Sequence, residues 1–285
     1  MRIQFTKMHG CGNDYIYVDM FKTPAFDFEK AAVALSDRHF GIGGDGIILV
    51  CPSDKADAKM RIFNADGSEG MMCGNGIRCV GKYVYDSGIA KKDVLKIDSL
   101  SGIKTLQMTI ESGKAVAARV DMGPAILTPA LIPVNLPGET AVGVPINADG
   151  IQRKMTCVSM GNPHAVIFVD EDPMELDLPA IGPKFEHHPL FPQRVNTEFV
   201  RVIDDHTLQM RVWERGSGET WACGTGTCAS AVAAVLNGYC RKGEDILVHL
   251  RGGDLVIRYT DETVYMTGPA ATAFTGSVEL SDYGI

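Results

Sequence analysis

The alternation of hydrophobic and polar residues along the chain predicts short β-strands in both halves. Runs of roughly four to eight residues rich in β-branched and aromatic side chains are typical of strands. In the first half such runs lie at 15–19, 46–50, 59–63, 105–110 and 115–122. In the second half they lie at 155–160, 165–170, 196–203, 208–213, 246–250, 255–259 and 263–268. The pattern therefore indicates a sheet in each half.

Two segments have the pattern of helices that begin and end in the same way. Residues 75–87 and 225–237 each follow a Cys-Gly-x-Gly turn, and Gly88 and Gly238 stand where a glycine commonly ends a helix. The second segment is small and apolar on every face, which predicts burial. A further helix is predicted at 28–37. Each half is thus expected to combine a sheet with one prominent helix.

The chain repeats a pattern at about half its length. The segment RIFNADGSEGMMCGNG at 61–76 matches RVWERGSGETWACGTG at 211–226, an offset of 150 residues (223 − 73 for the two cysteines). GNDYIYVD at 12–19 likewise resembles GNPHAVIFVD at 161–170. Several matches in the same order indicate two homologous halves of about 140 residues each.

The repeat predicts two lobes. We expect an N-terminal lobe over 1–130 that carries Cys73, and a C-terminal lobe over 145–270 that carries Cys223. Residues from about 270 to 285 are expected to pack on the first lobe. The stretch 129–150 is rich in proline and glycine, so it is expected to contain the crossing between the lobes.

Composition and charge exclude several classes of protein. The 285 residues are 45% hydrophobic and 22% charged, as is ordinary for a globular chain. Acidic residues outnumber basic ones by 35 to 27, which disfavours nucleic acid and anionic membranes as partners. The N-terminal residues contain no apolar segment of the signal-peptide kind, and no apolar run approaches roughly 18 residues. We therefore expect a soluble, cytoplasmic protein.

The eight cysteines are not spaced as metal ligands. Cys73 and Cys79 are six positions apart, Cys223 and Cys228 are five apart, and no CxxC pair occurs. Neither a metal nor a cofactor is predicted. A chain of this length without a secretion signal is expected to keep its thiols reduced. Cys79 and Cys228 point away from the preceding cysteine on a helix, and we expect them in the core.

Cys73 and Cys223 each stand directly before a predicted helix. A helix N-terminus exposes unpaired N–H groups with positive partial charge, which favours a bound anion and a thiolate. We therefore expect a lowered pKa for both thiols. Across a cleft between the lobes, one thiolate can remove the α-proton of a bound carboxylate while the opposite thiol delivers a proton to the other face. Such an active site inverts the carbon without a cofactor.

The two cysteine segments, NADGSEGMMCGNGIRC (64–79) and GSGETWACGTGTC (216–228), resemble those of diaminopimelate epimerases. MHGCGNDYIYVD (8–19), GNPH (161–164), VNTEF (195–199) and the pair at 214–215 are also similar, so the resemblance covers essentially the whole chain. It implies an α/β (α+β) fold of two pseudo-symmetric lobes, each a barrel-like, mostly antiparallel sheet around a central helix, and a homodimer. It further implies interconversion of LL- and meso-2,6-diaminopimelate, a small-molecule substrate, in lysine and peptidoglycan precursor biosynthesis.

The resemblance also implies roles for individual residues. Cys73 and Cys223 match the two acid–base residues, and His164 and Glu214 match side chains that support them. The positions that match substrate-binding residues are Asn13, Asn64, Gly74, Asn75, Asn162, Asn196, Glu214, Arg215, Gly224 and Thr225.

Two positions depart from the family pattern. Gly46 stands where many members have a glutamine, so we assign it no role in substrate binding. Phe274 stands where some members have a tyrosine linked to dimer contacts, which leaves the detail of the dimer interface open.

Two alternatives remain open from the sequence. One is a related cofactor-independent racemase of another amino acid, such as histidine. The set of asparagines and Glu214-Arg215 favour diaminopimelate over it, because they suit a second amino-acid head group. The other is a thiol-based redox or binding protein in which Cys73 and Cys223 form a switchable disulfide. Exchange of the substrate α-proton with solvent deuterium separates the classes, because a binding protein catalyses no exchange.

Overall fold

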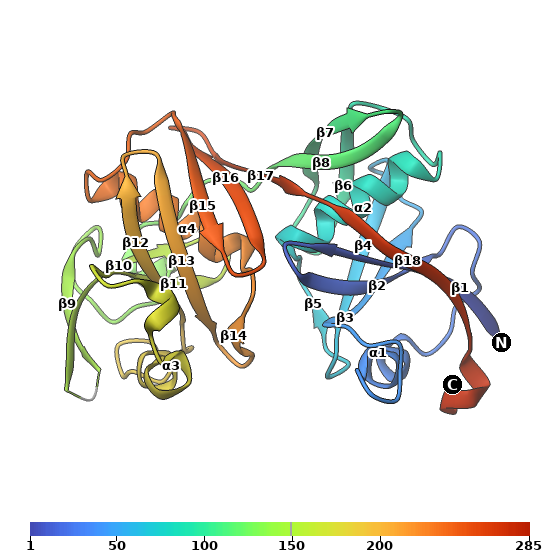
Figure 1. The fold of residues 1–285 in the computed structure, drawn as a ribbon, viewed down its shortest axis with the longest axis horizontal. Helices are drawn as coiled ribbons and strands as arrows, with labels where there is room; N and C mark the ends of the chain where they lie inside the picture. The colour runs from blue at the N-terminus through green and yellow to red at the C-terminus, as the bar shows by residue number, and fades with distance from the viewer. Residues whose placement is uncertain (149) are drawn as a thin grey trace. The chain divides into compact units, whose positions relative to one another are not determined.

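The computed structural model describes residues 1–148 and 150–285, which form two compact units. The first unit comprises Met1–Val120 together with Thr267–Ile285, and the second comprises Asp121–Met266 (Figure 1). The chain leaves the first unit within strand β8 (Lys114–Asp121) and returns to it within strand β17 (Val264–Pro269).

The prediction that the stretch 129–150 contains the crossing was wrong. This stretch belongs to the second unit, where Ile132, Val134 and Ala141 are buried in the hydrophobic core. Proline and glycine here shape the turns between core residues rather than a linker. A chain can cross between two units in extended strands, and such a crossing has no proline- or glycine-rich signature.

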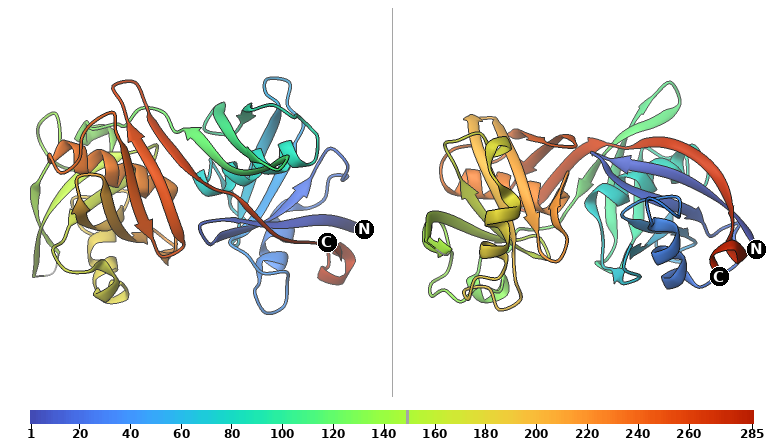
Figure 2. Two further views of the ribbon diagram at one scale, coloured as in Figure 1. Left: turned by 45° about the horizontal axis from the view of Figure 1, so that its top comes forward. Right: turned by 60° about the horizontal axis from the view of Figure 1, so that its bottom comes forward.

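The first unit is a mixed, mostly antiparallel sheet. Its strands are β1 (Arg2–Gly10), β2 (Asn13–Asp19), β3 (Gly46–Cys51), β4 (Ala58–Asn64), β5 (Glu69–Gly70), β6 (Val94–Asp98), β7 (Lys104–Glu111), β8 and β18 (Ala271–Glu279). The pairs β2–β3 and β4–β6 are parallel, and the pairs β1–β2, β3–β4, β4–β5, β6–β7 and β7–β8 are antiparallel. β18 runs antiparallel beside β1, and both chain termini lie in this unit (Figure 2).

The second unit repeats this pairing pattern. Its strands are β9 (Val144–Ala148), β10 (Ile151–Ser159), β11 (Pro163–Phe168), β12 (Asn196–Asp204), β13 (Thr207–Glu214), β14 (Gly218–Thr220), β15 (Asp245–Leu250), β16 (Gly253–Tyr259) and β17. Here β11–β12 and β13–β15 are parallel, whereas β9–β10, β10–β11, β12–β13, β13–β14 and β15–β16 are antiparallel. The parallel pairs occur at equivalent places in both units, which confirms the predicted fold class.

A buried helix lies at the centre of each unit. Helix α2 (Gly74–Asp86) contacts strands β1, β2, β3, β4, β6 and β7 of the first unit. Helix α4 (Gly224–Leu236) contacts strands β10, β11, β12, β13, β15 and β16 of the second. Contact with so many strands is typical of a sheet wrapped around a helix. Both helices begin one residue before the predicted position.

A second pair of helices also follows the repeat. Helix α1 (Phe28–Ser36) was predicted, whereas helix α3 (Leu178–Glu186) was not, because its segment contains Pro179 and Pro183. Both helices are capped by an aspartate, Asp27 and Asp177, whose carboxylate accepts the N–H three residues later. Short 3₁₀ helices lie at η1 (Pro129–Leu131), η2 (Pro173–Glu175) and η3 (Leu280–Tyr283). Within residues 1–148 and 150–285, no helix is long and apolar enough to cross a bilayer.

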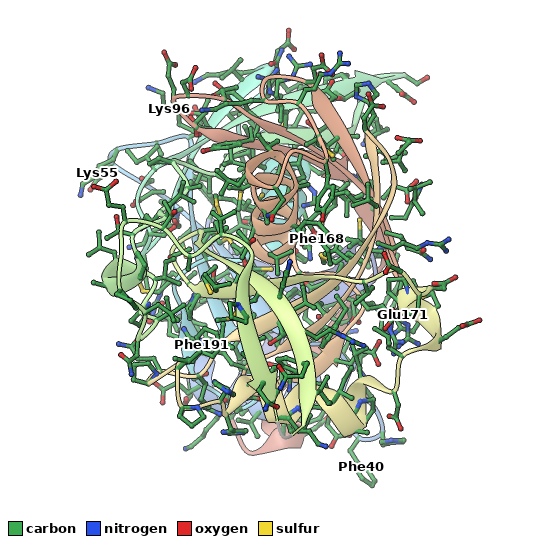
Figure 3. The ribbon with its side chains drawn as sticks, turned by 90° about the vertical axis from the view of Figure 1, so that its left-hand side faces the viewer. Phe40, Lys55, Lys96, Phe168, Glu171 and Phe191 are labelled. Atoms are coloured by element: carbon green, nitrogen blue, oxygen red, sulfur yellow. The ribbon has the colours of Figure 1, made fainter. Side chains whose placement is uncertain are left out.

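Each unit has its own hydrophobic core. In the first unit Ile16, Leu35 and Phe63 pack together between the sheet and α1. In the second unit Phe191, which Figure 3 labels, belongs to the core. Phe185 and Phe199 belong to the same core cluster. Separate cores explain why each half can position its own cysteine helix.

Candidate active site

Cys73 is the N-cap residue of α2. Its backbone is extended, and its sulfur accepts the N–H of Gly76 at 3.3 Å. Gly76 packs closely against the sheet, since an added Cβ would lie 2.6 Å from Cδ1 of Ile48. The thiol also donates to Oδ1 of Asn13 at 3.2 Å. The sulfur therefore lies at the positive end of a helix, as the sequence predicts.

The asparagines of the first unit lie in three different settings. Asn13 contacts Cys73 and donates through Nδ2 to Asp45 at 2.6 Å. Asn64 ends β4 and donates to the Ser68 hydroxyl at 3.1 Å. Asn75 follows Gly74 in the first turn of α2, but its side chain is buried and accepts from Nη2 of Arg78. The side chain of Asn13 thus contacts the Cys73 thiol, whereas the side chain of Asn75 points into the protein interior.

Cys223 repeats this arrangement in the second unit. It is the N-cap of α4, and its sulfur accepts the N–H of Gly226 at 3.4 Å. Gly224 opens the helix, and the Thr225 hydroxyl lies 3.5 Å from the sulfur. Cys223 is only 6% exposed, so a proton carrier here works largely out of water.

The polar side chains predicted around Cys223 form a connected group. Asn162 donates to the Thr225 hydroxyl at 3.3 Å and lies 3.0 Å from Nε2 of His164. The side chain of Asn196 links the start of β11 to the residue after β13. Its Nδ2 donates to the Pro163 carbonyl, and its Oδ1 accepts the N–H of Arg215. These predicted positions therefore lie together in one unit.

Glu214 and Arg215 follow each other at the end of β13 but face different partners. The Glu214 carboxylate accepts from the Thr220 hydroxyl and from the Cys223 thiol. Burial raises the pKa of the Glu214 carboxyl above its usual value. Arg215 is partly exposed, and its Nη1 donates to the Gln193 carbonyl at 2.9 Å. Of the two, Glu214 is the one that touches a cysteine.

For Cys223, the prediction of a lowered pKa was wrong for the protein without substrate. Burial raises the pKa of this thiol well above its usual value, and the nearby carboxylates of Glu214 and Glu198 raise it further. The Thr225 hydroxyl and the Gly226 N–H act in the opposite direction without cancelling the increase. The helix N-terminus does not outweigh burial and the two nearby acids, so Cys223 rests as a thiol.

Three residues beside the cysteine helices were not predicted from the sequence. Arg78 is fully buried in α2 and donates to the carbonyls of Gly74 and Pro269. Tyr15 is buried beside Cys73, and burial together with that thiol raises the pKa of its phenol well above the usual range. Glu198 lies under the first turn of α4. A signal existed for Glu198, since it alternates with Val200 and Val202 on one face of the predicted strand at 196–203.

The backbone at Gly46 is closely packed, and the cysteines and acids do not form a metal site among the described residues. Gly46 lies where β3 approaches β4, and an added Cβ would collide with the carbonyl oxygen of Phe63, so this chain has no room there for a larger residue. Among the described residues, no group of three or more His, Cys, Asp or Glu side chains is placed to hold a metal ion.

The fold is shared by a class of proteins of known structure that includes racemases and epimerases. A probable proline racemase from Agrobacterium radiobacter has a TM-score of 0.74 at 16% identity, covering 98% of this chain and 93% of that one. A hydroxyproline epimerase from Agrobacterium vitis has a TM-score of 0.70 at 16% identity, covering 97% and 91%. At such low identity the likeness concerns the fold alone.

The sequence comparison narrows this class to one family. The profile of the diaminopimelate epimerase family matches residues 5–128 and 156–273. The diaminopimelate epimerase of Acetivibrio thermocellus is 55% identical, covering 98% of this chain and 100% of that protein. That of Methanococcus maripaludis is 52% identical with the same coverage. The chain belongs to the diaminopimelate epimerase family and is an isomerase.

Proposed function

We propose that this protein interconverts LL- and meso-2,6-diaminopimelate by a two-base mechanism, with Cys73 and Cys223 as the proton carriers. The observation that carries the proposal is the identical placement of the two sulfurs, each accepting the N–H of the glycine three residues later. Membership of the family supports the choice of substrate. The reaction would serve lysine and peptidoglycan precursor biosynthesis.

The chemistry follows from the two protonation states of a thiol. The thiolate takes the α-proton, so the C–H bond breaks, an S–H bond forms, and the electron pair stays on the α-carbon and its carboxylate. The second thiol then gives its proton to the opposite face of that carbon, which inverts it. The raised pKa of the buried Cys223 thiol favours Cys223 as the proton donor, and Cys73, which must first give up the proton that it shares with Asn13, is proposed as the base.

The carbanion is the difficult species, and helix N-termini can stabilise it. The backbone N–H groups of Gly74 and Asn75, and those of Gly224 and Thr225, lie in first turns, where no intrahelical carbonyl accepts from them. In our proposal these groups bind the α-carboxylate, whose negative charge increases as the proton leaves. Cys223 carries out its transfer in a site with little water, where such interactions are strongest.

The remaining polar positions are proposed to bind the two amino-acid head groups. The asparagines concerned are Asn13, Asn64, Asn162 and Asn196. Arg215 is proposed to bind the distal carboxylate, because a guanidinium offers two parallel N–H donors. Nη1 of Arg215 donates to the Gln193 carbonyl, and the remaining N–H groups of the guanidinium are proposed to bind the ligand. Glu214 is proposed to support Cys223, with which it forms a hydrogen bond, and to interact with an ammonium group of the substrate.

A direct assay tests the substrate. Purified protein is incubated with LL-diaminopimelate without added cofactor, and the stereoisomers are separated on a chiral column. Formation of meso-diaminopimelate to an equilibrium mixture supports the proposal. L-Histidine and L-proline serve as comparison substrates, and faster inversion of either one would favour another racemase. The absence of inversion and α-proton exchange with every substrate would favour a binding or redox protein.

We further propose a cytoplasmic homodimer. Phe274 lies on β18 with 49% of its surface exposed, so an apolar side chain is available at this position for a contact between subunits. Light scattering coupled to gel filtration measures the mass of the assembly directly. A mass of one chain at micromolar concentration would contradict the dimer, and recovery in the membrane fraction would contradict the location.

A further inference from the structure

Glu198 and His164 form a fully buried pair in the second unit. Nδ1 of His164 lies 2.7 Å from Oε1 of Glu198, and neither side chain has exposed surface. Among the described residues, nothing donates a hydrogen bond to the other carboxylate oxygen, Oε2. Removing a carboxylate from water is costly, and one strong contact compensates for only part of that cost. The presence of Glu198 at this position therefore calls for an explanation.

The first unit shows that packing does not supply this explanation. Glu198 and Ile48 stand at equivalent places in β12 and β3, and each lies under the first turn of a cysteine helix. An added Cβ on Gly226 would lie 2.5 Å from Oε1 of Glu198, and one on Gly76 would lie 2.6 Å from Cδ1 of Ile48. An aliphatic side chain fills the same space in the first unit without a buried charge.

A continuous series of hydrogen bonds joins Glu198 to the sulfur of Cys223. Beyond the contact with Glu198, Nε2 of His164 lies 3.0 Å from Oδ1 of Asn162. Asn162 in turn donates to the Thr225 hydroxyl at 3.3 Å, and that hydroxyl lies 3.5 Å from the sulfur.

The donors and acceptors of this series fix its direction. A carboxylate and an amide oxygen only accept, so the proposal requires a proton on each ring nitrogen of His164. The Thr225 hydroxyl accepts from Asn162, which leaves its own proton free for the sulfur of Cys223. The negative charge of Glu198 thus orients the series so that the Thr225 hydroxyl can donate to the sulfur of Cys223.

We propose that the Glu198 carboxylate is a positioning residue that acts on Cys223 through His164. The proposal rests on the function proposed above and adds a residue to it. Glu198 holds the protonated imidazole, the imidazole orients the amide of Asn162, and Thr225 offers its proton to the thiolate that forms when Cys223 gives up its own. An isoleucine, as in the first unit, would fill the space but would leave this series without its charged end.

The test uses Glu198→Gln, which keeps the shape and removes the charge, and Glu198→Ile, which copies the first unit. We expect kcat to fall by about tenfold or more, as when an outer partner of a functional histidine is lost, with a smaller change in KM. Nitrogen-15 spectra of the His164 ring supply a second measurement. They should show protons on both nitrogens in the parent and the loss of one in the variants.

The matched control is Thr197→Val, one position away on the same strand. Thr197 is fully buried, and its hydroxyl has no hydrogen-bond partner among the described residues, so the change should leave kcat and the spectra unaltered. If Glu198→Ile does not fold, the kcat and the spectra of Glu198→Gln alone test the proposal. A Glu198→Gln enzyme with the kcat of the parent would overturn the proposal. So would a lower kcat with unchanged His164 spectra, because Glu198 would not then act through the histidine.

The two measurements also separate this proposal from the function on which it rests. If the parent protein inverts no amino acid, the proposed function fails. The spectra would still report whether Glu198 sets the protonation of His164. The rate at which iodoacetamide modifies Cys223 would then replace kcat, and an unchanged rate in Glu198→Gln would overturn the link to the thiol.

Discussion

Cys73 and Cys223 occupy the same position in two homologous units, each as the N-cap of a central helix with its sulfur 3.3–3.4 Å from a backbone nitrogen in the first turn. Their surroundings differ. Cys73 contacts an asparagine and lies beside Tyr15, whereas Cys223 contacts a threonine and lies near two buried carboxylates. The repeat thus places the two cysteines alike, and the acids near Cys223 raise the pKa of that thiol.

The resting state of Cys223 can be measured by its reactivity. Only the thiolate is alkylated, and a raised pKa moves its formation to higher pH. We expect iodoacetamide to modify Cys223 of the substrate-free protein with a midpoint above pH 9, which is about the ordinary pKa of a cysteine thiol. Mass spectrometry of the peptide that contains Cys223, at a series of pH values, gives the midpoint.

Glu214→Gln supplies the companion experiment. It removes one of the carboxylates that raise the pKa of Cys223, so the midpoint should move to lower pH. A midpoint well below 9 in the parent protein, or a shift to higher pH in this variant, would contradict the assignment.

Arg215 offers a test of how the far end of the substrate is recognised. We expect Arg215→Lys to lower kcat/KM for LL-diaminopimelate strongly, although it keeps the positive charge. The reason is that lysine cannot donate two parallel hydrogen bonds to one carboxylate. Losing such a contact should cost about 2–5 kcal/mol in transition-state binding. Arg153→Lys is the control, since Arg153 forms a surface ion pair with Glu171. Equal kcat/KM values for Arg215→Lys and the parent would place Arg215 outside the substrate site.

The packing of α3 against β13 gives a prediction about stability. An added Cβ on Gly182 would overlap the indole of Trp213, whereas the first unit has Ala32 and Phe63 at the equivalent positions. We therefore expect Gly182→Ala to lower the free energy of unfolding by about 1–3 kcal/mol, which urea denaturation can measure.

A double variant shows whether this loss comes from the proposed contact. Adding Trp213→Phe copies the first unit and should recover part of the loss caused by Gly182→Ala, so the two changes should not be additive. Trp213→Phe alone also removes the hydrogen bond from the indole N–H to Glu186 and should destabilise the protein. Strict additivity in the cycle would show that the two residues do not interact as the structure indicates.

Local patterns predicted the elements that follow a strong sequence rule. The repeat and the Cys-Gly-x-Gly turns located α2 and α4 to within one residue, and runs of β-branched residues located most long strands. Helix α3 was missed because two prolines obscure its pattern, although its Asp177 cap repeats Asp27. Strand β18 was missed because its residues 271–279 lack a hydrophobic run, and it forms by pairing with β1 at the other end of the chain.

The residues of the candidate site could be predicted from the sequence, but the pKa of the Cys223 thiol could not. Family motifs named the cysteines, asparagines and His164. Whether a thiol at a helix N-terminus is acidified depends on what else is buried beside it, and the sequence does not show that Glu198 and Glu214 lie near Cys223. The inward side chain of Asn75 likewise depends on Arg78, which becomes its partner only once α2 has formed.

The most direct test of the two-base account follows stereochemistry and isotope exchange together in Cys73→Ala and Cys223→Ala. LL-diaminopimelate is incubated in D₂O, and proton NMR and chiral chromatography report deuterium at the α-carbon and the formation of the meso isomer. Cys51→Ala, at a cysteine outside the helix caps, is the control and should match the parent. We predict that the parent inverts the carbon and places solvent deuterium on it, whereas neither cap variant inverts it although both remain folded. Near-normal inversion by either cap variant would contradict the account.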